Sequence, residues 1–267
     1  MIRQPLSRRA GLLLGLLSVV ILLVAYTALS YFQHLENPTD TTIPNWTQLA
    51  AGLVDMVEPG RSGDRILVVD SLATGKRLFL GLTISVVGAV LLGLHMGAFA
   101  TLEAVAVPQL SFLSKIVPTA AMAVFFVLVG TDMPMFVSIV VFGVLPPLAL
   151  SIHLAVKGVP DELVHKAYTL GASHMEVVWG VVFPTILPKI IDLVRLSVGP
   201  AMVYLIAAEM LVGDEGFGYR IRLLQRRLDM NVVYPYLVLL AGFGFGMDYG
   251  LRWLRKIVCP WYEEGRS

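Results

Sequence analysis

Residues 158–188 read GVPDELVHKAYTLGASHMEVVWGVVFPTILP, and this stretch predicts two short helices outside the membrane. Pro160 suits the first position of a helix, because an N–H group there has no partner within the helix in any case. Gly171 is well placed to end that helix in the left-handed conformation, which glycine adopts without a steric penalty. A second helix is expected over 173–182, and Pro184 is expected to stop it at the membrane surface.

The first of these helices, residues 161–170, is amphipathic. Its apolar side chains recur at helical spacing on one side: Leu163, Val164, Ala167, Tyr168 and Leu170. A helix of this kind can lie on the lipid headgroups with its apolar face down. It can also insert its apolar ridge into a groove of a soluble partner protein. The residues alone leave both accounts open.

The sequence on both sides of this stretch is strongly apolar. Hydrophobic residues make up 57% of the chain and charged residues only 15%, whereas about a quarter of a soluble domain is charged. A membrane-spanning helix needs about 20 mostly apolar residues. Six segments qualify: Gly11–Phe32, Leu78–Thr101, Leu110–Gly130, Met135–Val156, Ile190–Val212 and Val232–Leu254. Lys115 and Pro118 interrupt the third, where neighbouring helices can tolerate a kink. We therefore expect an all-α integral membrane protein with about six transmembrane helices.

The first apolar run follows Arg3, Arg8 and Arg9 and so imitates a secretory signal. A cleavable signal has a shorter apolar region and a small-x-small cleavage site. The run here is about 22 residues long, and no convincing Ala-x-Ala follows it. We expect an uncleaved first helix. A helix-like run over 45–57 interrupts the polar stretch that comes next.

Basic residues near the chain ends bear on orientation. Those within 3–9 and 252–256 place both termini in the cytoplasm by the positive-inside rule. An even number of spans agrees with this, and it places the connection 157–189 in the cytoplasm as well. Four arginines within 213–231 then fall outside, against the rule. The pattern favours this orientation without fixing it.

The composition leaves little room for chemistry within the chain. A formal net charge of +1 gives no basic field for nucleic acid. The single cysteine, Cys259, cannot form an internal disulfide or complete a metal cluster. No glycine-rich phosphate loop with Lys and Ser or Thr occurs, so no nucleotide site is expected. We predict no catalytic residues, no metal site and no cofactor, and we do not expect an enzyme.

Charged residues within the predicted spans are candidate functional residues. Arg195 and Glu209 fall in the fifth span and Asp248 in the sixth. They can form ion pairs between helices or contact a transported solute. Glu209 would repel an anion, so a gate or packing role is favoured there.

The segment after the fifth span is a second candidate site. Gly216 and Gly218 flank Phe217 there. The three residues fit either an ordinary turn or a loop that dips into the membrane and helps to close a path.

The segment 158–188 resembles the cytoplasmic loop signature of ABC import permeases: Glu-Ala-Ala, three residues, Gly, nine residues, Ile, one residue, Leu-Pro. Here the matching positions are His165, Lys166, Ala167, Gly171, Val181, Phe183 and Pro184. The spacing from Gly to Pro is kept. His165 and Lys166 depart from the signature, and His165 cannot act as the anion that the family's Glu offers to its ATPase. The resemblance implies that these residues, with Leu170, form the ATPase-coupling surface.

The resemblance covers roughly residues 70–257 and is greatest to the nitrate/sulfonate/taurine (NitT/TauT) group. TLGASHMEVVWGVVFPTILPKI and the later AAEMLVGDEGFGYRI, residues 207–221, are similar to that group's pattern. It implies a type I ABC importer permease-like bundle in the bacterial inner membrane. The implied parts are an N-terminal transmembrane helix (1–32), a polar extracytoplasmic connection (33–77), a permease core (78–257) with its coupling loop (157–189), and a cytoplasmic tail (258–267).

The resemblance also implies partners. These are a second permease copy in a homodimer, two ATPase subunits that hold ATP and Mg, a periplasmic or lipid-anchored solute-binding protein, and membrane lipid. The implied cargo is a small polar or anionic solute. A secondary transporter or channel would show inverted repeats or paired broken helices, and we find none. A membrane-embedded enzyme would need clustered acids or histidines, and the acids here are scattered. An ABC permease for another class of solute is the third alternative.

Overall fold

The computed structural model describes residues 7–38, 40–57 and 66–262, and within these ranges every regular element is a helix. Predictions that concern Arg3 and the last five residues of the tail lie outside the described residues. The chain divides into two compact units. The first takes in residues up to Ile66 together with Leu223–Leu237, and the second takes in Leu67–Arg222 and the chain from Val238 onward.

The first unit contains α1 (Arg8–Glu36) and α2 (Trp46–Val57). The Tyr26 hydroxyl of α1 donates a hydrogen bond of 2.6 Å to the Pro44 carbonyl, and its ring meets Trp46 edge-on with centroids 5.5 Å apart. These contacts hold the start of α2 against α1. The helix expected over 45–57 is therefore confirmed.

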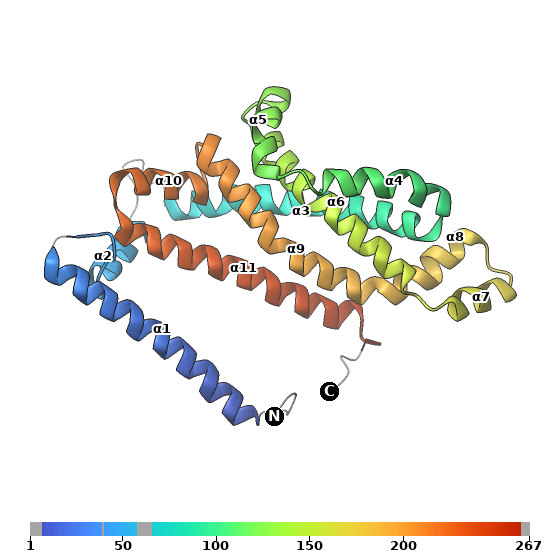
Figure 1. The fold of residues 1–267 in the computed structure, drawn as a ribbon, viewed down its shortest axis with the longest axis horizontal. Coiled ribbons are helices and arrows are strands. Elements are labelled where there is room, and N and C mark those ends of the chain that lie inside the picture. Colours follow the sequence, from blue (N-terminus) through green and yellow to red (C-terminus); the bar gives the residue numbers. More distant parts are fainter. Residues whose placement is uncertain (1–6, 39, 58–65, 263–267) are drawn as a thin grey trace. The chain divides into compact units, whose positions relative to one another are not determined.

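The second unit contains seven helices that are labelled in Figure 1: α3 (Ile66–Ala98), α4 (Ala100–Leu113), α5 (Pro118–Val129), α6 (Met133–Lys157), α7 (Asp161–Thr169), α8 (His174–Val177) and α9 (Phe183–Val212). The helices α10 (Phe217–Arg227) and α11 (Met230–Val258) begin in one unit and end in the other. The central helix is α6, which packs most extensively against α9 and also against α4 and α5. A Cβ at Gly93 would lie 2.7 Å from the Ala149 carbonyl, so glycine permits the close approach of α3 to α6.

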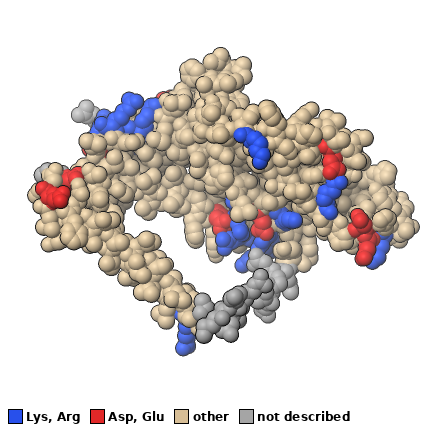
Figure 2. Space-filling view, viewed as in Figure 1, with Lys and Arg blue, Asp and Glu red and all other residues tan. Residues whose placement is uncertain are grey.

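Five of the described helices are long and apolar enough to span a membrane, and the pair α4 and α5 makes a sixth span if it counts as one. Much of the face in Figure 2 carries no charged side chain, as a lipid-exposed surface requires. The expectation of about six spans holds in this form. The third span, predicted over Leu110–Gly130 with an interruption at Lys115 and Pro118, is broken at that place: α4 and α5 meet at an angle of 98°, and α4 begins earlier than predicted, at Ala100. Pro118 lacks an N–H group and disfavours helix at Val117, which is extended with φ −70° and ψ 117°.

The expectation that Pro184 stops a helix is wrong. The chain stays helical from His174 to Val212 through a π-helical segment, Val178–Val182. The Phe183 N–H donates to the Val178 carbonyl, five residues back. Since Pro184 follows this shift in the first turn of α9, its missing N–H group is tolerated there.

Candidate functional site

The segment α7–α8 is a helical hairpin with a defined turn. Gly171 has φ +86°, and its N–H donates to the Tyr168 carbonyl at 2.9 Å. The Ala172 N–H donates to the Ala167 carbonyl at 3.1 Å. This pair of bonds is a Schellman motif, which satisfies the last carbonyls of a helix. The prediction that Gly171 ends the first helix in the left-handed conformation is confirmed.

The second arm of the hairpin begins with a capping box. The Ser173 hydroxyl accepts from the Glu176 N–H, and the Glu176 carboxylate accepts from the Ser173 N–H at 2.7 Å. The Tyr168 hydroxyl lies 2.9 Å from His174 Nδ1 and joins the two arms. Helix α7, the turn and α8 are therefore fixed to one another by local bonds.

The apolar side chains of α7 face two ways. Val164 and Ala167 pack against the core of the unit. Leu170 is 88% exposed, and Leu163 and Tyr168 are each 40% exposed. No residue of α7 is buried. The helix therefore offers apolar surface outward while two side chains anchor it inward.

The other predicted coupling residues differ in their surroundings. His165 and Lys166 lie on the exposed side of α7, and His165 Nδ1 donates to the Asp161 carbonyl at 2.8 Å. Val181, Phe183 and Pro184 are half-buried in the π-helical segment and the start of α9. These three follow the hairpin in sequence and can support it, and they are less exposed to a partner protein than Leu170 is.

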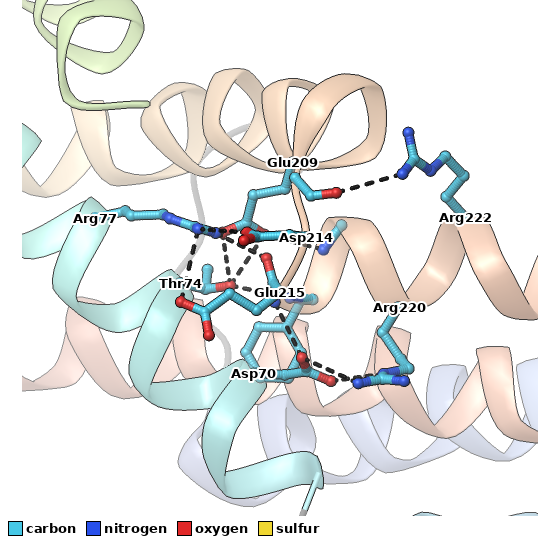
Figure 3. A network of polar contacts seen from close by, with 12 residues as sticks. Asp70, Thr74, Arg77, Glu209, Asp214, Glu215, Arg220 and Arg222 are labelled. Atoms are coloured by element: carbon cyan, nitrogen blue, oxygen red, sulfur yellow. Dashed lines mark hydrogen bonds and ion pairs between the residues drawn. The ribbon is translucent and has the colours of Figure 1, made fainter. Parts of the chain in front are cut away.

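The second candidate site is a polar network around Glu209, near the end of α9 that is farther from the hairpin (Figure 3). Glu209 is fully buried. Its carboxylate accepts three hydrogen bonds: from Arg77 Nη1 at 3.0 Å, from the Thr74 hydroxyl at 2.9 Å and from the Gly218 N–H at 3.0 Å. A carboxylate at membrane depth costs several kcal/mol unless it is paired in this way. Glu209 is thus tied to α3 and to the start of α10.

The same network fixes the turn between α9 and α10. The Gly216 N–H donates to Asp70 Oδ1 and the Phe217 N–H donates to the Thr74 hydroxyl, both at 3.0 Å. Arg220 Nε donates to Asp70 Oδ2 at 2.8 Å. Gly216 has φ +108°, and a Cβ there would lie 2.6 Å from Glu209 Oε1, so only glycine fits. Gly216 therefore ends a turn that is bound to α3, and Phe217 and Gly218 begin α10 directly after it.

Arg195 and Asp248 lie apart from this network and pair with each other. Arg195 Nε is 2.9 Å from Asp248, and Arg255 Nη1 is 2.6 Å from Asp192. These bonds join α9 to α11. The arrangement is the ion pair between helices that the sequence allowed, and the structure does not bring these residues to Glu209.

Three residues of the Glu209 network were not predicted from the sequence. Asp70, Thr74 and Arg77 precede Leu78, where the apolar run was expected to begin. Their spacing of four and three residues places them on one face of a helix. That spacing was the available signal, once the helix was extended back to Ile66.

Comparison with known proteins adds to this geometry. A family model described as "Binding-protein-dependent transport system inner membrane component" matches residues 81–258. The taurine transport system permease protein TauC of Escherichia coli K12 is 27% identical to the chain, over 98% of this chain and 94% of that protein. The bicarbonate transport system permease protein CmpB of a Synechocystis strain is 22% identical, over 74% of this chain and 71% of that protein.

Solved structures share the fold. Two inward-facing crystal forms of the MetNI methionine ABC transporter contain chains that match with TM-scores of 0.57 and 0.60. The first match covers 79% of this chain and 96% of the other at 18% identity, and the second covers 74% and 99% at 19% identity. The chain therefore shares the fold of these transporter chains.

Proposed function

Because the chain belongs to the family of binding-protein-dependent transport system inner membrane components, we propose that its α7–α8 hairpin couples it to an ATPase and that its Glu209 network acts as a gate. The chain is the membrane-spanning permease subunit of an ATP-driven ABC importer. It is a transport subunit that spans the membrane several times.

The proposed assembly has two copies of this chain in a bacterial inner membrane, with both termini in the cytoplasm. Each hairpin docks on one of two ATPase subunits, which hold ATP and Mg and carry out hydrolysis. A periplasmic or lipid-anchored binding protein delivers a small polar or anionic solute at the opposite face.

The observation that carries the coupling proposal is the form of the hairpin. Its turn is closed by a Schellman motif and a capping box, while Leu170 at the tip is almost fully exposed. A rigid hairpin with an apolar tip suits insertion into a protein groove. A helix that only lay on lipid would need no fixed turn at Gly171.

The gate proposal rests on where the Glu209 network lies. It binds α3, α9 and the turn 213–216 at one end of the unit, roughly 50 Å along the helix from the hairpin at the other end of α9. Movement of the hairpin would reach this end through α9. Two discrete arrangements of the turn, one bound to α3 and one released, would serve a gate.

The coupling proposal is tested by purification of the chain from its native membrane in mild detergent, with mass spectrometry and an ATPase assay on the eluate. Gly171→Val forces a β-branched residue into the left-handed conformation, which costs about 1–2 kcal/mol and distorts the hairpin tip. We expect the variant to fold but to recover much less ATPase subunit.

Gly15→Val is the matched control, because Gly15 lies in the middle of α1 with nothing within 4 Å of the added Cβ. The control should recover the ATPase subunit as the unmodified chain does. Absence of any ATPase subunit from the unmodified chain's eluate would refute the coupling proposal.

A further inference from the structure

The ion pairs between α9 and the end of α11 share one carboxylate between two cations. Asp248 of α11 lies 2.9 Å from Arg252 of its own helix and 2.9 Å from Arg195 of α9. The other nearby carboxylate, Asp192, is engaged by Arg255 at 2.6 Å. The side chain of Arg252 is 54% exposed, so its guanidinium can meet a further anion from outside the chain.

Lys256 adds a second exposed cation one helical turn beyond Arg252. It forms no ion pair with another described residue. Residues four apart lie next to each other on the surface of a helix, so the two cations are neighbours. A guanidinium and an ammonium group at this spacing can bind the oxygens of one phosphate together. The end of α11 therefore offers an anion site that Asp248 satisfies only in part.

Three aromatic side chains continue the same face of α11 away from the cations. Phe245 is 72% exposed, Tyr249 is 69% exposed and Trp253 is 63% exposed. With Arg252 and Lys256 they recur at the spacing of one helix face. Residues of the opposite face pack against the core of the unit: Phe243, Met247 and Leu251. We call the five exposed residues the α11 stripe.

The α11 stripe changes in character along the helix as a membrane surface does. The apolar run of this span ends at about Leu254, so Arg252 and Lys256 lie where the hydrocarbon region gives way to headgroups. Tyr249 and Trp253 are of the two residue types that favour this interface. Phe245 lies roughly 10 Å deeper than Arg252 along the helix, at the level of acyl chains.

We propose that the α11 stripe is a binding site for an anionic phospholipid. Its phosphodiester group would lie between Arg252 and Lys256, and one acyl chain would run along Trp253, Tyr249 and Phe245. The phosphate then supplies the anion that Arg252 lacks while it shares Asp248 with Arg195. The inference goes beyond the proposed function and does not depend on it, because lipid surrounds the chain in either orientation.

A lipid suits this site better than a soluble phosphate compound. Free phosphate would use the two cations alone and leave the exposed aromatic face without a partner. A zwitterionic lipid such as phosphatidylcholine carries its own cation, so the two basic side chains gain less from its headgroup. The combination of an anionic headgroup with an acyl chain is what matches the whole length of the stripe.

Native mass spectrometry of the full chain, purified with the subunits that accompany it, tests the proposal. The probes are dioleoylphosphatidylglycerol and dioleoylphosphatidylcholine, which share acyl chains and differ in headgroup charge. The first phosphatidylglycerol should bind about thirtyfold more tightly, the preference expected from two basic residues beside an anionic lipid. Inorganic phosphate should fail to displace it.

Arg252→Gln combined with Lys256→Gln should remove this preference, while Lys256→Arg alone should keep it. Asp248 stays paired with Arg195 in the double variant, so the contact between α9 and α11 is retained. Arg9→Gln is the matched control, because Arg9 is an exposed arginine at an end of another membrane-spanning helix, outside the stripe. Circular dichroism and gel filtration establish that each variant is folded.

Several results would overturn the proposal. Equal affinity for the two lipids would show that the headgroup charge is not read. An equal loss in Arg9→Gln would show a general attraction of basic residues for anionic lipid in place of a site. Displacement by inorganic phosphate would show that the aromatic face takes no part. Absence of bound phosphatidylglycerol, as when a second copy of the chain covers the stripe, would exclude the lipid as its occupant.

Discussion

Arg77 and Glu209 show what a single residue contributes to this fold. Arg77 is 6% exposed on its side chain, and its guanidinium lies 4.0 Å from the centre of the Phe136 ring as well as beside Glu209. Arg77→Met would leave a buried carboxylate without its cation, which costs about 3–5 kcal/mol. We expect a clear fall in the melting temperature in detergent, measured by intrinsic fluorescence.

Asp214→Asn provides the comparison for this prediction. Asp214 also pairs with Arg77, at 3.6 Å, but its side chain is 91% exposed. Water screens such a pair, so the melting temperature should not change. If the two variants melt alike, the buried pair does not hold the turn 213–216 to α3.

Cys259 gives a second prediction at the scale of one residue. The side chain is 2% exposed, and burial raises the pKa of its thiol above the ordinary value. Only the thiolate reacts with maleimide, so a raised pKa means a smaller reactive fraction at neutral pH. Labelling of the folded chain should be slow at pH 7 and rise about tenfold per pH unit toward the pKa.

The same reaction in sodium dodecyl sulfate is the reference for Cys259. Because the sequence contains one cysteine, all label reports this site. The unfolded thiol should react faster at pH 7, and the ratio of the two rates should become smaller as the pH rises. Identical rates throughout would show that the thiol is freely exposed in the folded chain.

At the scale of an element, the capping box of α8 sets where the second arm of the hairpin begins. Ser173→Ala removes the hydroxyl that accepts from the Glu176 N–H, and loss of such a cap costs about 1 kcal/mol. Amide exchange over 174–177 should become about fivefold faster, while exchange in α6 stays the same. Hydrogen–deuterium exchange with mass spectrometry measures both segments in one experiment.

Ser71→Ala is the matched change for the capping prediction. Ser71 donates to the Leu67 carbonyl within α3 and caps no helix. It should leave the exchange of 174–177 unaltered. Equal protection of this segment in Ser173→Ala would mean that packing of Val177 and Val178, which are buried, holds the arm without the cap.

The elements differ in how far the sequence could predict them. The end of α7 was predictable, because Gly171 is a local signal for a left-handed residue. The continuation of the helix through Pro184 was not predictable, because it depends on the π-helical segment before it, and the amino-acid composition of that segment gives no signal for a π-helix. Lys115 and Pro118 did mark the break in the third span, but its angle is set by how α5 packs on α6 and α9.

The residues of the Glu209 network also differ in how far the sequence could predict them. Glu209 could be found as a charge in an apolar run. Its partners Thr74 and Arg77 are 135 and 132 residues away in sequence, and a single sequence carries no signal for that pairing. The spacing of Asp70, Thr74 and Arg77 suggests a shared helix face and says nothing of what the face meets.

At the scale of the whole molecule, the α7–α8 hairpin and the Glu209 network lie at opposite ends of α9, so they should face opposite sides of the membrane. With the proposed orientation, the hairpin faces the cytoplasm and the turn 213–216 faces the periplasm. Single cysteines at Leu170 and Asp214, in a Cys259→Ser background, make this measurable, because both positions are strongly exposed. A membrane-impermeant maleimide should label Asp214→Cys in cells with an opened outer membrane.

Leu170→Cys should be labelled only after the inner membrane is also permeabilised, and a bound ATPase should slow that labelling further. The arginines within 213–231 make this test sharp, because by the positive-inside rule alone they favour the reverse orientation. Labelling of Leu170→Cys from outside, with Asp214→Cys protected, would invert the molecule and place the hairpin beyond the reach of any cytoplasmic ATPase. Labelling in the proposed sense would mean that two ion pairs outweigh the charge rule: Arg77–Glu209, which joins α3 to α9, and Arg220–Asp70, which joins α10 to α3.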